Sequence, residues 1–332
     1  MMLRILALLL LLAITVTGQT KPPASAQSRE SDEVLKLDTR EVLLPVTVRD
    51  RAGQFVPNLK AEDFSIYEDN VLQPISSFSL KHLPVHVVLL IDTSSSVTRE
   101  LDDFKDAANN FAARLDPNDQ ISVIKFDDKV ELVMDWTANR NALRRALNRL
   151  TTGMFTNFND ALWLTARDQL NRVNGRKAII VLTDGIDSGR GRKTQAQVLR
   201  AMQEAEAPIY AVSKTEIQRS AEKRDLELSE KTSSPVANQM RVDGLKLSLA
   251  ALDQGETWLT KLSEETGGRL FLPKSFDELS DAYQQVADEL RSQYVIFYTP
   301  RDASGDGRYR TVRVKAKCSD CRTTSRLGYF AK

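Results

Sequence analysis

The nearly continuous apolar stretch at residues 85–91 (VHVVLLI) constrains the fold more than any other feature of this chain. A strand with one face in water alternates apolar and polar residues, whereas an unbroken run is typical of a strand that is covered on both faces. A further strand is expected at 121–126 and a second apolar run follows at 178–182, and the segments between the strands place apolar residues at helical spacing. This alternation predicts an α/β fold with a doubly wound, mainly parallel sheet and helices on both of its faces.

Short β-like segments lie on either side of this α/β region. Residues 41–83 and residues 293–332 both contain brief runs with the two-residue alternation of strands. We therefore expect an α/β domain over residues 84–292, flanked by an N-terminal and a C-terminal β segment. The two flanking segments are candidates for one composite β domain with the α/β domain inserted between them, and separate packing is the alternative.

A long, highly charged segment at about residues 214–250 interrupts the α/β domain. It lies between a strand that ends near Val212 and a helix predicted to begin near Glu256, and it is far longer than an ordinary strand-to-helix connection. Because it leaves the carboxyl end of a strand, we expect it to border the binding edge of the sheet and to contribute to the choice of partner. A disordered insertion without a role is the alternative.

The N-terminus has the features of a secretory signal. Arg4 provides the positive charge, residues 5–16 form an apolar core too short to span a bilayer comfortably, and residues 24–26 (ASA) suit cleavage. We predict a signal peptide at 1–26, a linker at 27–40 and an exported protein, in the bacterial periplasm or outside the cell. An uncleaved membrane anchor is the alternative. No integral membrane segment is expected after cleavage.

The charge balance argues against a nucleic-acid partner. The 332 residues include 46 basic and 45 acidic side chains, which gives a formal charge of +1, and the two signs alternate along the chain. A protein that binds nucleic acid needs a basic surface to neutralise phosphates. The sequence carries no comparable signal for an oligomeric state.

The two cysteines, Cys318 and Cys321, form the pair CxxC. A structural zinc site needs four ligands, and the two histidines, His82 and His86, lie far away in the sequence. In an exported protein we expect a local disulfide across a turn rather than metal or redox chemistry.

Clusters of oxygen-bearing side chains follow two of the predicted strands. Asp92, Ser94 and Ser96 alternate directly after the first strand, Asp184 follows the run at 178–182, and Thr156 lies on a third loop. Ligands of an open parallel sheet bind beyond the carboxyl ends of its strands. Carboxylate and hydroxyl oxygens suit a hard divalent cation. Single residues of these types are also common turn and cap residues, so the prediction rests on their combination.

These motifs resemble those of a known family. DTSSS at 92–96, Thr156 four residues before Asp160, and LTDG at 182–185 resemble the von Willebrand factor type A (VWA) domain and its metal-ion-dependent adhesion site (MIDAS). The resemblance covers about residues 84–292, and the flanks resemble bacterial secreted members of the group. It implies that Mg²⁺ or Mn²⁺ is held directly by Ser94 and Ser96, directly or through water by Thr156, and mainly through water by Asp92 and Asp184.

The resemblance further implies an exported adhesion or assembly module, in which the cation captures an Asp or Glu carboxylate of a protein partner. A metal-independent scaffold or a subunit of an envelope complex is the alternative. A Ser-His hydrolase is disfavoured because His82 and His86 both precede Asp92 and the chain lacks the GxSxG motif. A metal-assisted hydrolase is disfavoured because the sequence offers no convincing general base. We therefore expect that the protein is not an enzyme.

Overall fold

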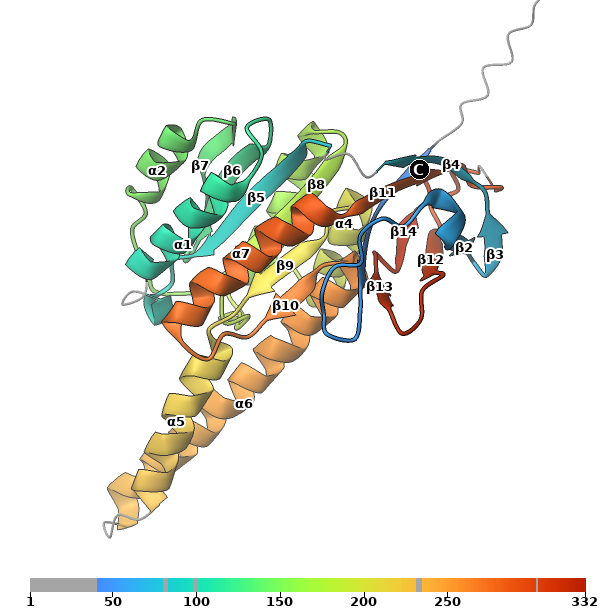
Figure 1. Ribbon diagram of the computed structural model, residues 1–332. Coiled ribbons are helices and arrows are strands. Elements are labelled where there is room, and N and C mark those ends of the chain that lie inside the picture. The colour runs from blue at the N-terminus through green and yellow to red at the C-terminus, as the bar shows by residue number, and fades with distance from the viewer. Residues whose placement is uncertain (1–40, 80–82, 98–100, 231–234, 303) are drawn as a thin grey trace, which may run out of the picture. The chain divides into compact units, whose positions relative to one another are not determined.

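The computed structural model describes residues 41–79, 83–97, 101–230, 235–302 and 304–332 (Figure 1). These residues all belong to one compact unit, Thr39–Lys332. The predicted signal peptide and linker, residues 1–40, lie outside the described residues. Within the described ranges, no helix is both long enough and apolar enough to cross a membrane.

Six strands form the central sheet, in the order β10-β9-β8-β5-β6-β7. All neighbouring pairs are parallel except β6 and β7, which pair in the antiparallel direction. The strands are β5 (Val85–Asp92), β6 (Gln120–Phe126), β7 (Val130–Thr137), β8 (Arg176–Leu182), β9 (Ile209–Val212) and β10 (Arg269–Phe271). Strand β5 lies inside the sheet and is almost entirely buried, as its unbroken apolar sequence predicts.

Helices cover both faces of this sheet (Figure 1). One face packs against α1 (Leu101–Arg114), α2 (Arg140–Leu147) and α7 (Phe276–Ser292), and its core includes Phe104 and Tyr283. The opposite face packs against α3 (Phe158–Leu164), α4 (Gln195–Ala205) and the end of α6, and its core includes Met202 and Leu259. The predicted fold class, a mainly parallel α/β sheet with helices on both faces, is confirmed.

Two four-stranded antiparallel sheets flank the α/β core, and each combines strands from both ends of the chain. Their orders are β13-β1-β11-β4 and β14-β12-β2-β3. The N-terminal strands are β1 (Val42–Arg49), β2 (Phe64–Glu68), β3 (Val71–Gln73) and β4 (Ile75–Ser79). The C-terminal strands are β11 (Tyr294–Tyr298), β12 (Tyr309–Ala316), β13 (Arg322–Thr324) and β14 (Gly328–Phe330). The two sheets share one apolar core that contains Leu44, Ile66 and Val314, and Cys318 and Cys321 form a disulfide between β12 and β13.

The charged insertion is a pair of helices, α5 (Thr215–Glu230) and α6 (Pro235–Thr266), which run side by side (Figure 1). We call this pair the hairpin. The prediction that a helix begins near Glu256 was wrong, because α6 begins at Pro235. The two helices contact each other along their length, for example where the Ser248 hydroxyl donates to Glu222 Oε1 at 2.8 Å. Val242 and Leu252 of α6 are buried although the surrounding sequence is charged.

Candidate metal centre

The candidate site lies at the carboxyl ends of two neighbouring parallel strands. Strands β5 and β8 pair directly, with Ile91 opposite Leu182, so the residues that follow each strand meet at one edge of the sheet. Asp92 ends β5, and Thr183 and Asp184 follow β8. The strand register therefore brings together two motifs that are far apart in the sequence.

Four of the five predicted ligands, Asp92, Ser94, Ser96 and Asp184, form one hydrogen-bonded chain, which we call the cup. Asp92 Oδ1 accepts a hydrogen bond from the Ser94 N–H at 2.9 Å, which fixes the turn after β5. The hydroxyl oxygens of Ser94 and Ser96 are 3.1 Å apart. The Ser96 hydroxyl donates to Asp184 Oδ2 at 3.2 Å and thereby joins the two loops. The side-chain oxygens of the four residues thus lie together in one small volume.

Thr156, the fifth predicted ligand, lies on the loop that precedes α3. Its N–H donates to the Ser188 hydroxyl at 2.8 Å, and its carbonyl accepts from the Ser188 N–H at 2.9 Å. Thr156 is therefore fixed to the segment that follows Asp184, and it is largely buried. Among the described residues, the hydrogen-bonded chain of the cup does not include it.

Burial makes the two carboxyl groups of the cup hard to ionise. Asp92 is 0% exposed and Asp184 is 4% exposed. Burial first, and the charge of Asp184 second, raise the pKa of Asp92 to about 7. Burial likewise raises the pKa of Asp184. Two carboxylates that lie close together away from water need a positive charge beside them, and a divalent cation supplies one.

The donor set of the cup fits Mg²⁺ or Mn²⁺, which prefer oxygen ligands and retain bound water. Ser94 and Ser96 provide hydroxyl oxygens to the cup, whereas Asp92 and Asp184 provide carboxyl oxygens. In the part of the chain that the structure describes, no group of three or more His, Cys, Asp or Glu side chains is placed to hold a metal. A cation at the cup would therefore keep more of its positive charge than one ligated by three carboxylates.

Residues outside the five predicted ligands also stabilise the cup. The Thr183 hydroxyl donates to Asp92 Oδ2 at 2.8 Å, so both oxygens of Asp92 are engaged. The Thr93 hydroxyl donates to Asp127 Oδ2 at 2.9 Å, and Lys125 Nζ lies 3.2 Å from the same oxygen. Asp127 directly follows β6, so the strand-end rule that located Asp92 and Asp184 could also have located this residue.

The base of the hairpin contacts both loops of the cup. Lys214, which follows β9, donates from Nζ to the backbone carbonyl of Ser96, and the Thr215 hydroxyl lies 3.4 Å from the carbonyl of Asp184. A Cβ at Gly255 of α6 would lie 2.6 Å from the Asp184 carbonyl oxygen, so only glycine permits this close approach. Lys214 and Thr215, at the base of the insertion, thus border the cup, as we expected for this segment.

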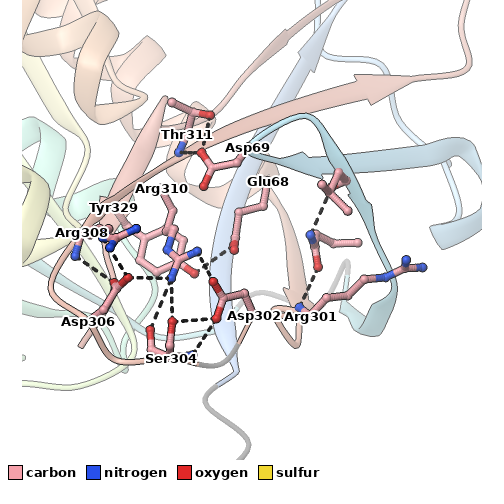
Figure 2. A network of polar contacts seen from close by, with 12 residues as sticks. Glu68, Asp69, Arg301, Asp302, Ser304, Asp306, Arg308, Arg310, Thr311 and Tyr329 are labelled. Carbon is pink, nitrogen blue, oxygen red and sulfur yellow. Dashed lines mark hydrogen bonds and ion pairs between the residues drawn. The ribbon is translucent and has the colours of Figure 1, made fainter.

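A second oxygen-rich loop joins β11 to β12 and repeats the pattern of the first motif. Asp302, Ser304 and Asp306 alternate as Asp92, Ser94 and Ser96 do, and Asp302 Oδ1 likewise accepts from the N–H two residues later, at 3.1 Å. Figure 2 shows the guanidinium of Arg310 among these side chains. Its distances to Asp302 Oδ2, Ser304 Oγ and Asp306 Oδ2 are 2.6, 3.0 and 3.4 Å. We call this the arginine loop, because Arg310 supplies its positive charge.

Residues 87–186 match the family of von Willebrand factor type A domains. This segment of the chain is therefore similar to von Willebrand factor type A domains, and it makes up less than half of the chain. An uncharacterized protein of Synechocystis sp. is 31% identical over 109 residues, which are 32% of this chain and 26% of the relative. The match therefore spans about a quarter of the relative's length.

Solved structures of VWA proteins are similar to the chain at low identity. The von Willebrand factor domain of the type V pilus tip protein Mfa5 from Porphyromonas gingivalis is 24% identical, over 32% of this chain and 39% of that one, with a TM-score of 0.30. The von Willebrand factor type A protein from Catenulispora acidiphila is 13% identical, over 83% and 75%, with a TM-score of 0.45. Proximal thread matrix protein 1 from the mussel byssus, with a zinc-occupied MIDAS motif, is 17% identical, over 66% and 48%, with a TM-score of 0.45.

VWA domains are commonly adhesion or protein-binding modules, and they are usually not enzymes. Many of them bind divalent cations at a MIDAS and protein ligands beside it. The matched residues 87–186 contain all five predicted ligand positions of this chain, from Asp92 to Asp184.

Proposed function

We propose that this protein is an exported binding module that uses a divalent cation, Mg²⁺ or Mn²⁺, to capture an Asp or Glu carboxylate of a protein partner. The observation that carries the proposal is the hydrogen-bonded chain of the cup at the ends of two adjacent strands. Ser94 and Ser96 would hold the ion through their hydroxyls, and Asp92 and Asp184 would act mainly through water. Thr156 would complete the set from the neighbouring loop.

The electrostatics of the cup support a bound cation rather than a purely structural role. The cup brings two acidic groups into a dry environment, where burial raises the pKa of each. Removing two carboxylates from water costs several kcal/mol unless a positive charge offsets it. Because neutral hydroxyls would contact the ion directly and the two carboxylates would act mainly through water, the ion would stay electrophilic and attract a carboxylate from outside as a direct ligand.

Titration calorimetry of the full chain with Mg²⁺ and Mn²⁺ tests the metal site. We expect saturable binding that Ser94→Ala and Ser96→Ala each weaken by about tenfold or more, because each substitution removes one ligand. Ser95→Ala is the matched control: Ser95 lies between the two ligands, but its hydroxyl donates to the Met154 carbonyl. Equal losses in all three variants, or saturable binding in none of the proteins, would refute the metal site and leave a metal-independent scaffold.

The carboxylate step is tested with peptides. Pools of short peptides that contain one Asp or Glu should bind the protein in Mg²⁺ and dissociate in EDTA, whereas the same peptides with Asn or Gln should not bind. A carboxylate is required because only an anionic oxygen gains from the residual charge of the ion. Binding that is equal for the acid and amide peptides would refute this part of the proposal.

A further inference from the structure

A basic loop lies next to the cup, and the proposed function does not use it. The loop joins β8 to α4 and carries three cationic side chains, those of Arg190, Arg192 and Lys193. Two hydrogen bonds between Ser188 and Thr156, at 2.8 and 2.9 Å, join this loop to the one that precedes α3. Because Thr156 is a predicted ligand, the loop directly adjoins the candidate metal site. We call Arg190, Arg192 and Lys193 the basic rim.

Aromatic rings hold two cations of the basic rim in place. The guanidinium carbon of Arg190 lies 3.3 Å from the centroid of the Phe155 ring, and Phe155 directly precedes Thr156. Lys193 Nζ lies 3.8 Å from the centroid of the Trp163 ring on α3. A guanidinium that stacks on a ring keeps the N–H donors at its edge available and is already ordered before it binds an anion. Arg190 is also exposed, so the stack presents it to solvent beside Thr156.

The nearby carboxylates bind backbone N–H groups instead of the side chains of the basic rim. Asp187 Oδ1 accepts from the Gly189 N–H at 2.8 Å. Asp160 Oδ1 accepts from the N–H groups of Arg192 and Lys193, both at 2.8 Å. Among the residues that the structure describes, no carboxylate forms an ion pair with the basic rim. Unused side-chain donors, rather than net charge, therefore favour the rim as an anion site.

Other arginines of the same molecule show the contacts that Arg190 lacks. Arg310 lies among the side chains of the arginine loop, with Asp302 at 2.6 Å. The guanidinium of Arg219 contacts three carboxylates, those of Glu216, Asp253 and Glu256. These arginines hold the protein's own loops and helices together. The position of Arg190 over a ring leaves its donors for a carboxylate from another molecule.

We propose that Arg190 binds a second acidic side chain of the same protein partner, so that the module recognises a segment with two spaced acidic residues. The inference rests on the proposed function, because the first carboxylate is the one that the ion captures. A guanidinium can bind a carboxylate through two parallel hydrogen bonds, which adds direction as well as affinity. Because the stack on Phe155 fixes Arg190, one spacing between the two acids should fit best.

Peptides of equal length with one or two Asp residues test this inference on the full chain. In Mg²⁺, the two-Asp peptides with the best spacing should bind about tenfold or more tightly than the one-Asp peptides, as measured by fluorescence anisotropy. Arg190→Gln should remove this advantage and leave the affinity for one-Asp peptides within about threefold. Lys193→Gln should remove less of it, because Trp163 lies further along α3 from Thr156.

Arg172→Gln is the matched control. Arg172 is also exposed, but it precedes β8 and so lies at the opposite end of that strand from Asp184. This variant should keep the full advantage of the two-Asp peptides. Equal losses in Arg172→Gln and Arg190→Gln, or an advantage that does not depend on the spacing of the two acids, would overturn the inference and leave only a general attraction of acidic peptides.

Titration calorimetry with Mn²⁺ separates this inference from the proposed function. Arg190→Gln should bind the ion as the wild type does, and a loss of affinity would overturn the inference and assign Arg190 to the support of Thr156. If the wild type binds metal and one-Asp peptides but gains nothing from a second Asp, the proposed function stands and the inference fails. If the wild type binds no metal, yet binds two-Asp peptides in EDTA through Arg190, the proposed function fails and the site at Arg190 stands. Binding of neither metal nor peptides overturns both.

Discussion

The cup and the arginine loop place the same kind of oxygens at the same spacing, yet they obtain their positive charge differently. Asp302 is exposed, with 58% of its side chain in solvent, and Arg310 lies within the loop. Asp92 is 0% exposed, and the lysine that approaches its loop does so through a backbone carbonyl. The comparison teaches that alternating Asp and Ser residues do not by themselves identify a metal site. The cup and the arginine loop differ in burial and in whether a cationic side chain lies among the oxygens, and these differences favour the cup as the candidate metal site.

The strongest test of the comparison is one substitution in each loop. Asp184→Asn should weaken Mn²⁺ binding by about a hundredfold or more, because it removes one of the two carboxylates that face the ion. Asp306→Asn, the matched change in the arginine loop, should leave the affinity unchanged. Calorimetric titration of both variants measures this, and a comparable loss in Asp306→Asn would show that the arginine loop takes part in metal binding.

The two loops should also respond to pH with opposite signs. Asp92 has a folded-state pKa of about 7, above its unfolded value of about 3.9, so the metal-free folded protein binds the additional proton. Its contribution to stability is therefore fully present near pH 4 and is lost as the pH rises towards 7, by an amount on the order of 2–4 kcal/mol. Guanidinium unfolding in EDTA at pH 5 and pH 7.5 measures this difference, which should shrink in Asp92→Asn.

Asp302 behaves in the opposite way. The hydroxyl of Ser304 first, and Arg310 second, hold the pKa of Asp302 below its ordinary range. Asp302 therefore contributes to the stability of the folded protein at a pH above its unfolded pKa, and this contribution is lost as the pH falls below about 4. A metal-free protein whose stability rises between pH 5 and pH 7.5, with Asp92 intact, would contradict the assignment of the raised pKa to the cup.

Removing the arginine should give a smaller effect that stays local. Arg310→Met leaves Asp302 and Asp306 without their shared cation, so we expect the melting temperature to fall by about 2–4 °C. Metal binding at the cup should not change. Hydrogen exchange at the amides of Ser304 and Arg308, whose N–H groups donate to Asp302 and Asp306, should become faster. Slow exchange at both amides would show that the carboxylates hold the loop without Arg310.

Shortening the hairpin should change metal binding at the cup only slightly. Replacing residues 223–247 by a short glycine linker keeps Lys214, Thr215 and Gly255, the residues that contact the cup. We expect Mn²⁺ affinity to stay within about threefold, and binding of a protein partner to decrease if the hairpin contributes to partner choice. A loss of metal binding, measured by calorimetry, would show that the outer part of the hairpin supports the cup.

The sequence predicted the fold class well because that class depends on local patterns. The apolar run at 85–91 could only become a strand covered on both faces, and the structure confirms the mainly parallel sheet. The predicted ligands could be located because parallel strands end at one edge. The position of a ligand directly after a strand was therefore enough to predict the edge of the sheet at which it lies.

The rest could not be predicted because its signals are weak or not local. Helix α4 was missed because its capping box, Thr194 with Gln197, follows a glycine- and arginine-rich loop that dominates the local composition. The start of α6 was predicted too far along the chain, because the charged residues around Val242 and Leu252 obscure the apolar spacing of these buried positions. The approach of Lys214 to Ser96 depends on the order of strands in the sheet, which no short window of sequence contains.

The junction between α7 and β11 has a mechanical consequence. Only Gln293 separates the end of α7 from Tyr294, the first residue of β11. Near the end of α7, Glu289 forms an ion pair with Arg49 of β1, and β1 is the strand that pairs with β11. A pull along the axis of α7 would therefore load the hydrogen bonds between β1 and β11 in shear. The flanking β sheets thus anchor α7, and a force applied to them would reach the α/β core directly, with only Gln293 between β11 and α7.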